Sequence, residues 1–274
     1  MPAFDGAGCS ESTVVKQDHF AKFLHMHMQI CKGQIGKVEA HPPYIFFDLH
    51  AGPGTTYDQD GSPLIFARKA MEFPFPCLSY HFDKKEQTCR TLSAHFRDLT
   101  ADSPVMPHEF NVMVGDHNEN IDCVLSDFRF CTQRFSGLIY ADPNGGVIPV
   151  EVINKILSLP CFARLEVLIG VNATAIKRVC KRFADRDKPN LAAQLDRVKK
   201  SVIILREPVG RWQFSLVLLT NWAGFPVMER QGFHKINTMV GQEIMRELNL
   251  THKEKGGNPP PPRLPVKPQL GFKF

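Results

Sequence analysis

The sequence predicts an α/β fold built around a mostly parallel sheet. Four short apolar segments, each the length of a strand, alternate with segments that have helical periodicity. Each of the four is closed by an acidic residue, and the first also runs into a turn that contains two glycines. The four segments are residues 44–49, 77–82, 110–115 and 137–141. Because 274 residues are enough for one substantial core, a single large domain over residues 14–251 is expected.

Composition places the chain among globular proteins and excludes few functions. Hydrophobic residues make up 43% and charged residues 22%, and the formal charge of +5 permits an anionic partner. The eight cysteines include no Cys-x-x-Cys pair, which favours buried or half-buried free thiols in a reducing compartment over a metal site. No apolar run approaches the roughly 20 residues of a membrane span, and the N-terminus lacks a signal-peptide core. We therefore expect a soluble, cytoplasmic protein with no membrane partner and no metal.

The N-terminal part is expected to be flexible over residues 1–13 and helical over residues 14–31, where apolar residues recur with a helical period. Lys16 precedes that apolar face, and a solvated first turn is the ordinary place for such a lysine. Two prolines before residue 44 stop any helix there. The first strand is apolar except for Asp48, which is typical of a strand that is covered on both faces.

The turn after the first strand reads His50-Ala51-Gly52-Pro53-Gly54. Its glycines let the backbone turn sharply and let a ligand approach the chain closely. An ordinary strand-to-helix turn explains these residues equally well. Further along, Ser62 as N-cap and Pro63 at the first helical position predict a helix that runs to residue 73. The long connection between strand and helix leaves room for a ligand.

Polar motifs follow the other three strands at the point where each strand ends. Asp83 closes the second strand, Asp116 and His117 follow the third, and Asp142-Pro143-Asn144 follows the fourth. In open parallel sheets, ligands bind outside the carboxyl ends of the strands. Each aspartate alone could simply cap the next helix. Together with Asp48, however, the succession favours carboxylates that converge on one crevice.

The second half of the chain continues the alternation and closes with an antiparallel pair of strands. The expected elements are helices over 150–157, 173–183, 191–200 and 235–249, and strands over 162–171, 201–207 and 212–220. The helix over 173–183 carries four basic residues whose ordinary place is a solvated face, namely Lys177, Arg178, Lys181 and Arg182. Residues 252–274 are rich in proline and are expected to form a disordered tail.

The strand ends can be assigned to parts of a ligand. A glycine turn for close approach, an acid at residue 83 for ribose hydroxyls and an Asp-His pair for an adenine edge fit either S-adenosylmethionine or a dinucleotide. The fourth strand end favours S-adenosylmethionine, because Asp142 could accept a hydrogen bond from an exocyclic amino group while Pro143 directs the next carbonyl toward the same nitrogen. Such positioning aims the nitrogen lone pair at a sulfonium methyl. A base in a duplex would have to be flipped out to reach it.

Taken together, Asp48-x-His50-Ala51-Gly52-x-Gly54, Gly61-Ser62-Pro63 and the later strand ends resemble the three-Cys-motif partner protein family over residues 14–250. They are also similar to bacterial enzymes that methylate adenine N6 in large-subunit ribosomal RNA. The resemblance implies the Rossmann-like class I methyltransferase fold, with a mostly parallel seven-stranded sheet and an antiparallel strand near the C-terminal end. It implies S-adenosylmethionine as cofactor. The implied cofactor-binding residues are Lys16, Asp48, His50, Ala51, Gly52, Gly54, Ser62, Asp83, Asp116 and His117, and the implied catalytic residues are Asp142, Pro143 and Asn144.

The chain departs from this pattern at Asn144-Gly145, where adenine-N6 enzymes commonly have a proline and an aromatic residue that stacks on the base. Stacking would have to come from elsewhere, with Phe47, Tyr57 and Trp222 as candidates. Two functions therefore stay open. One is a methyltransferase that acts on a nucleic-acid amino group, with adenine N6 first. The other is a methyltransferase-like partner protein that binds nucleic acid without transferring a methyl group. Either leaves room for a protein partner.

Overall fold

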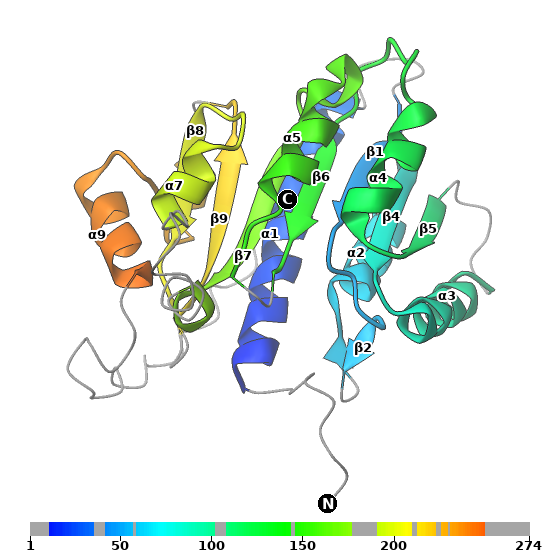
Figure 1. Cartoon of the computed structure of the whole chain (residues 1–274), viewed down its shortest axis with the longest axis horizontal. Coiled ribbons are helices and arrows are strands. Elements are labelled where there is room, and N and C mark those ends of the chain that lie inside the picture. The colour runs from blue at the N-terminus through cyan, green and yellow to red at the C-terminus, as the bar shows by residue number, and fades with distance from the viewer. Residues whose placement is uncertain are drawn as a thin grey trace, which may run out of the picture.

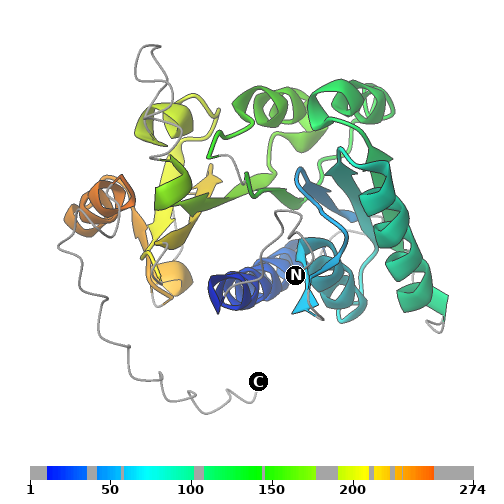
Figure 2. The same cartoon turned by 60° about the horizontal axis from the view of Figure 1, so that its bottom comes forward.

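A three-layered α/β architecture is seen in the computed structural model, with one sheet between two layers of helices (Figure 1, Figure 2). The structure describes residues 11–35, 42–56, 59–101, 108–143, 146–176, 191–209, 213–222, 226–229 and 231–249. None of the described helices has the length and apolarity needed to cross a membrane.

The sheet has eight strands in the order β10-β8-β9-β7-β6-β1-β4-β5. Five neighbouring strands are parallel, from β7 to β5, whereas β9 is antiparallel to both β7 and β8. Figure 1 shows the arrowheads of β6 and β9 pointing in opposite directions. The strands are β1 (Tyr44–Asp48), β4 (Cys77–Asp83), β5 (His108–Val114), β6 (Gly137–Ala141), β7 (Glu166–Asn172), β8 (Val202–Arg206), β9 (Phe214–Thr220) and β10 (Phe233–Lys235).

Helices cover both faces of the sheet, which explains why the central strands are apolar without alternation. On one face lie α1 (Glu11–Ile35), α2 (Ser62–Met71), α3 (Glu86–Ala101) and α8 (Pro226–Glu229). On the other lie α4 (His117–Ser126), α5 (Val150–Ser158), α7 (Leu191–Asp196) and α9 (Met239–Leu248). Strand β1 shows the consequence, since Phe46 packs in the core beneath α1 and α2 while Phe47 packs in the core beneath α4 and α5.

The mostly parallel Rossmann-like sheet and its antiparallel strand near the C-terminal end confirm the predicted fold class. The sheet has one more strand than predicted. Residues 233–235, placed partly in the last helix, form β10 and pair with β8. The helix starts later because Thr238 caps it, its hydroxyl accepting a hydrogen bond from Gly241 N at 3.1 Å.

Other boundaries differ for local reasons. The strand predicted from residue 162 begins at Glu166, because the single turn η1 (Pro160–Phe162) precedes it. The connection after β1 contains a small hairpin of β2 (Thr55–Thr56) and β3 (Gln59–Asp60). The N-cap of α2 is Gly61, so the prediction that Ser62 caps this helix is wrong.

The described cysteines are free thiols. Cys31, Cys77, Cys89 and Cys161 are buried, as expected, whereas Cys123 is exposed. The basic residues at 177, 178, 181 and 182 lie outside the described residues, as do Tyr57 and Asn144.

Candidate functional site

A cavity of about 1200 Å³ opens at the carboxyl ends of the parallel strands. Its walls come from the start of α1, the turn after β1, the start of α2 and the ends of β4, β5 and β6. The predicted site residues that line it are Lys16, His50, Ala51, Gly52, Gly54, Ser62, Asp83, Asp116, His117, Asp142 and Pro143. Residues up to 127 positions apart in the sequence thus share one cavity.

Asp48 lies beneath this cavity and not in its wall. Its carboxylate is fully buried and accepts hydrogen bonds from Ser62 Oγ at 2.6 Å and from His50 N at 3.1 Å. Burial raises the pKa of Asp48 to about 6, against the lowering effect of these two bonds and of the Lys16 charge. Asp48 therefore contributes to the cavity indirectly, by fixing the positions of Ser62 and His50 through these hydrogen bonds. The hydroxyl of Ser62, expected to cap α2, instead ties that helix to the end of β1.

The glycine turn has the backbone that its sequence indicates. Gly52 and Gly54 have φ angles of +67° and +89°, a region that side chains with a Cβ rarely adopt. A Cβ on Gly54 would lie 2.9 Å from Leu92 Cδ1, so this glycine also permits close packing on α3. A Cβ on Gly52 would meet no atom within 4 Å. Gly52 therefore faces the open space of the cavity, where a ligand can approach the backbone.

Two histidines face each other across the turn. The rings of His50 and His117 are 5.3 Å apart and nearly perpendicular. Burial, aided by the neighbouring His117, lowers the pKa of His50 to about 4, so His50 is neutral at pH 7. Its buried Nδ1 has no hydrogen-bond partner among the described residues. An unpaired buried nitrogen in the wall of a cavity is a group that a polar ligand could satisfy.

Asp116 caps helix α4 and is held in its charged form. Its carboxylate accepts hydrogen bonds from Asn118 N at 2.9 Å and Asn118 Nδ2 at 2.7 Å, and forms an ion pair with Lys84 Nζ at 2.5 Å. The Lys84 ammonium and the Asn118 backbone hydrogen bond hold the pKa of Asp116 well below its usual range. Its role as a helix cap, considered as an alternative in the sequence, is therefore real. Because Asp116 also lines the cavity, the cap and a ligand role are compatible.

Asp83 has the arrangement expected of an acid that accepts ligand hydroxyls. It is half-buried at the end of β4 and lines the cavity. One carboxylate oxygen accepts a hydrogen bond from Lys85 N at 2.8 Å. This bond fixes the side chain near the cavity and, since a carboxylate can accept several bonds, leaves capacity for a ligand.

Lys16 and Asp142 form an ion pair across the cavity. Their side chains are 24% and 22% exposed, so the pair is largely withdrawn from water. Burial lowers the pKa of Lys16 to about 8, although the Asp48 charge opposes this change. Lys16 therefore lies between two carboxylates, with its ammonium 5.7 Å from the centre of the Phe214 ring. It is not on a solvated face, which was its ordinary reading from the sequence.

Gly170 of β7 leaves the space that Asp142 occupies. A Cβ at this glycine would lie 2.8 Å from Asp142 Oδ1. Sequence reasoning did not select Gly170, although a glycine within a buried apolar strand is a known sign of close approach by another group.

The aromatic candidates for stacking on a base are not in the described wall. Phe47 is fully buried in the core and Trp222 follows the far end of β9; neither lines the cavity. The aromatic rings that do line it, Phe20, Phe82 and Tyr140, are each only about 1% exposed. The candidates Phe47 and Trp222 are therefore wrong on geometry, because a buried ring and a ring at the opposite edge of the sheet cannot reach a ligand here.

The described residues contain no group of three or more His, Cys, Asp or Glu side chains that could hold a metal ion. The residues of the cavity instead fit an organic ligand with polar and apolar parts, because charged groups, unpaired histidine nitrogen, small residues and aromatic edges share its wall.

No family model matches the sequence. No curated protein matches it either. Similar solved structures include Methanococcus jannaschii fibrillarin, a pre-rRNA processing protein, with 14% identity, a TM-score of 0.39 and coverage of 68% of this chain and 69% of that one. The plantazolicin methyltransferase BamL, in complex with a triazolic desmethylPZN analogue and SAH, has 10% identity, a TM-score of 0.42 and coverage of 77% and 87%. A DUF574 family protein from Streptomyces avermitilis has 11% identity, a TM-score of 0.44 and coverage of 75% and 82%.

At these identities and scores, nothing about ligand or substrate follows from the similarity. The sheet itself defines the class. Strands β7, β6, β1, β4 and β5 are parallel, and β9 lies between β7 and β8 and is antiparallel to both. The chain has the Rossmann-like fold of class I methyltransferases, with the cavity at the carboxyl ends of its strands.

Proposed function

We propose that this protein is an S-adenosylmethionine-dependent methyltransferase that modifies an exocyclic amino group of a nucleic acid, with adenine N6 as the first candidate. The observation that carries the proposal is the single cavity at the strand ends. It brings the glycine turn, Asp83 and the Asp116–His117 pair to the same space as Asp142. These are the groups that the two halves of a methyl transfer require, one set to hold the donor and one acid to hold the acceptor.

The cofactor would be held by residues from three parts of the chain: the turn after β1, the end of β4 and the start of α4. Gly52 offers backbone without a side chain in the way, and the unpaired Nδ1 of His50 offers a hydrogen-bonding group beside it. Asp83 would accept hydrogen bonds from ribose hydroxyls, and Asp116 with His117 would border the adenine. When bound, S-adenosylmethionine supplies an electrophilic methyl group on a sulfonium.

The acceptor side of the proposed chemistry belongs to Asp142. Its carboxylate lines the cavity and would accept a hydrogen bond from the target amino group, which orients the nitrogen lone pair. In the structure, the Lys16 ammonium forms an ion pair with this carboxylate. A substrate amine must therefore compete with the Lys16 ammonium, so Lys16 would regulate access to Asp142. Asn144 stays a proposed contributor on its position in the sequence alone.

A nucleic-acid substrate is supported by charge and by motif. The chain carries a formal charge of +5, and Lys84 and Lys85 lie at the rim of the cavity. The motifs resemble those of bacterial enzymes that methylate adenine N6 in large-subunit ribosomal RNA. A base paired in a duplex would have to be flipped out to reach Asp142 in the cavity.

A second function, a methyltransferase-like partner protein without transfer activity, is favoured by two observations. Asp142 is already satisfied by Lys16. In addition, the residues after Pro143 lack the aromatic residue that usually stacks on the base. Such a protein would bind the cofactor or a nucleic acid while the Lys16 ammonium blocks access of a substrate amine to Asp142.

The test is transfer of label from S-adenosylmethionine to a panel of single-stranded and structured DNA and RNA. Wild type should label at least one substrate, and Asp142→Ala should reduce this by at least about a hundredfold, because orientation of the reacting groups is lost. Asp127→Ala, which replaces an exposed aspartate outside the cavity, is the matched control and should leave transfer unchanged. Cofactor binding without labelling of any substrate would reject the enzyme and favour the partner protein.

A further inference from the structure

The edge of the sheet opposite the cavity carries exposed aromatic rings together with basic side chains. Strands β6 and β7 begin at this edge and the antiparallel β9 ends there, as the arrowheads in Figure 1 show. The exposed aromatic side chains of the described residues, Phe130 at 91% and Trp222 at 43%, both lie beside these strand ends. We call the following residues the basic-aromatic surface: Arg129, Phe130, Arg134, Arg164, Lys200 and Trp222.

The turn that presents Phe130 is firmly anchored. The side chains of Phe128 and Phe135 on either side of it are buried, and their ring centres lie 4.8 and 5.3 Å from that of Phe162. Phe135 N also donates a hydrogen bond to Cys161 O at 2.9 Å. Packing therefore explains both ends of the turn but not the exposed ring between them. A single exposed ring would be ordinary, but this one has company along the edge.

Trp222 lies at the same edge, beside two basic residues. Continuing the register of β9 with β7 and β8 beyond their paired ends sets Trp222 level with Arg164 on one side and Lys200 on the other. Side-chain hydrogen bonds hold this corner together, because Lys200 Nζ donates to Ala163 O at 3.1 Å and Asn221 Nδ2 donates to the same oxygen at 3.4 Å. Trp222 cannot reach the cavity, but here it has basic neighbours.

The basic-aromatic surface is positively charged at neutral pH. Its arginines are exposed and form no ion pair within the described part of the chain, namely Arg129, Arg134 and Arg164. Asp127 at the start of the turn offsets one of these charges. Glu166, which begins β7, offsets little, because burial raises its pKa to about 7 and leaves it partly protonated there. An anionic partner would therefore be attracted to this edge.

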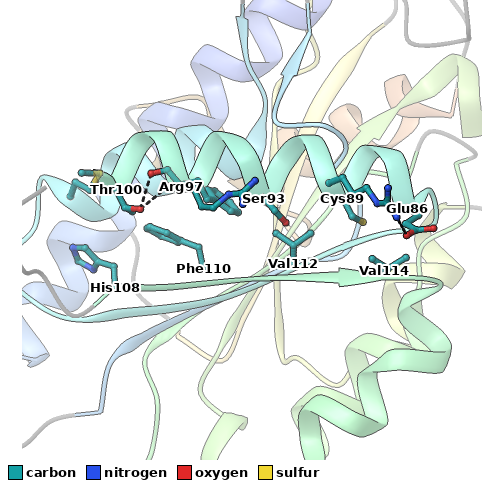
Figure 3. A pocket seen from close by; sticks show the side chains of 12 residues that line it. Glu86, Cys89, Ser93, Arg97, Thr100, His108, Phe110, Val112 and Val114 are labelled. Atoms are coloured by element: carbon teal, nitrogen blue, oxygen red, sulfur yellow. Dashed lines mark hydrogen bonds and ion pairs between the residues drawn. The ribbon is translucent and has the colours of Figure 1, made fainter. Parts of the chain in front are cut away.

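The groove along β5 does not combine these features. This groove, of about 760 Å³, lies between α3 and the edge strand, and Figure 3 shows Phe110 and Val112 on its apolar floor. Its rim on α3 carries Arg90 and Arg97, but Arg90 is paired with Glu86 at 2.6 Å. The groove thus has one exposed arginine without an ion pair among the described residues and no exposed ring, so it offers a control position and not a second surface of this kind.

We infer that the basic-aromatic surface docks single-stranded nucleic acid, with Phe130 and Trp222 stacking on bases and the arginines contacting phosphates. Aromatic rings stack on any base, and guanidinium groups bind phosphate through two parallel hydrogen bonds. Neighbouring strands lie about 4.8 Å apart, so the ends of β6, β7, β9 and β8 extend over roughly 15 Å. Rings and basic groups distributed along such a row match the alternating bases and phosphates of a strand.

This inference goes beyond the proposed methyl transfer. The surface lies at the opposite edge of the sheet from Asp142, so it would hold a nucleic acid without touching the reacting base. A protein without transfer activity could use the same surface.

The test is binding of a fluorescein-labelled single-stranded RNA of about 16 nucleotides to the full-length chain, measured by anisotropy without S-adenosylmethionine and over a range of salt concentrations. Phe130→Ala should weaken binding at least about fivefold, because stacking on a base is lost. Arg134→Gln should reduce the slope of log affinity against log salt concentration by about 0.7, the value for one phosphate contact on a single strand. Both side chains are exposed, so urea unfolding of the variants should match that of wild type.

Two variants away from the surface are matched controls. Met239→Ala removes an 89% exposed apolar side chain on α9, and Arg97→Gln removes the exposed arginine beside the groove along β5. Both should bind the RNA as wild type does, with the same dependence on salt.

Three results would overturn the inference. One is a wild type that does not bind the RNA, and another is unchanged binding by both Phe130→Ala and Arg134→Gln. The third is displacement of the RNA by polyglutamate as readily as by unlabelled RNA, which would indicate a site for an acidic protein. RNA binding that depends on Phe130, in a protein that labels no substrate, would support the surface and reject only the proposed transfer.

Discussion

As the pH rises toward neutral, an Asp48→Asn variant should gain stability relative to wild type. The carboxylate is fully buried, and its pKa of about 6 lies above the ordinary value of 3.8. This difference of about two corresponds to about 3 kcal/mol, at roughly 1.4 kcal/mol per pKa unit. The folded state binds the proton more tightly than the unfolded state, so the contribution of Asp48 to stability is present below pH 3.8 and is lost as the pH rises through about 6.

The assay is urea unfolding of wild type and Asp48→Asn at several pH values across this interval. Subtracting one free energy of unfolding from the other cancels the groups that the two proteins share. The difference should rise in favour of Asp48→Asn by about 3 kcal/mol as the pH increases through the interval. A difference that stays flat with pH, or that falls, would refute the account of Asp48 as a buried and costly carboxylate. Confirmation would indicate that Asp48 is kept for the site, since it holds Ser62, the turn at His50 and the charge of Lys16.

Three further predictions test other parts of the site. Gly170→Ala should displace the Asp142 carboxylate, since the new Cβ would lie 2.8 Å from its Oδ1. We expect slower methyl transfer with unchanged cofactor affinity. The control is Gly33→Ala, whose Cβ would meet no atom within 4 Å and which should leave both quantities unchanged. Gly52→Ala should cost about 1 kcal/mol of stability because φ is positive there, and it should weaken cofactor binding. Gly54→Ala should mainly destabilise the fold, because its Cβ would contact Leu92. Equal effects of the two variants on cofactor binding would contradict this prediction. Lys16→Met should remove a rise in stability between pH 8 and 10.5, worth about 3 kcal/mol in wild type, because the unfolded state binds more protons there; the same rise in the variant would show that another group is responsible.

The arrangement of the strand ends was accessible from the sequence for a simple reason. In parallel sheets the carboxyl ends of successive strands meet at one edge, so Asp83, Asp116 and Asp142 could be placed together without knowing any side-chain contact. The apolar runs also predicted the boundaries of the central strands well. For example, β6 covers the residues predicted for it. The turn at Gly52 and Gly54 was likewise readable, because positive φ angles favour glycine.

Contacts between distant segments were not accessible. Lys16 and Asp142 are 126 positions apart, and nothing in the local pattern of α1 indicates that this lysine turns into the cavity. Asp48 was expected to touch the ligand, whereas its burial beneath the wall depends on how Ser62 and Lys16 pack above it. The groove along β5 is also a property of tertiary structure. Periodicity predicts which face of α3 is apolar, but not that the helix leaves the floor of this edge strand open.

Helix boundaries failed where short-range bonds competed with periodicity. Lys235 was predicted as the first residue of the last helix, yet residues 233–235 pair with β8 and the helix begins only after its cap at Thr238. Ser62 shows the same competition in reverse. Its sequence position is typical of an N-cap, but its hydroxyl donates to a buried carboxylate, which binds it more strongly than a backbone amide would.

The central claim is that the cavity at the strand ends binds S-adenosylmethionine, and calorimetry with that compound tests it most directly. We expect one molecule bound per chain, an affinity at least about tenfold weaker for Asp83→Ala because hydrogen bonds to a charged acceptor are lost, and an unchanged affinity for Asp127→Ala. Absence of binding by wild type, or equal affinity of wild type and Asp83→Ala, would contradict the claim.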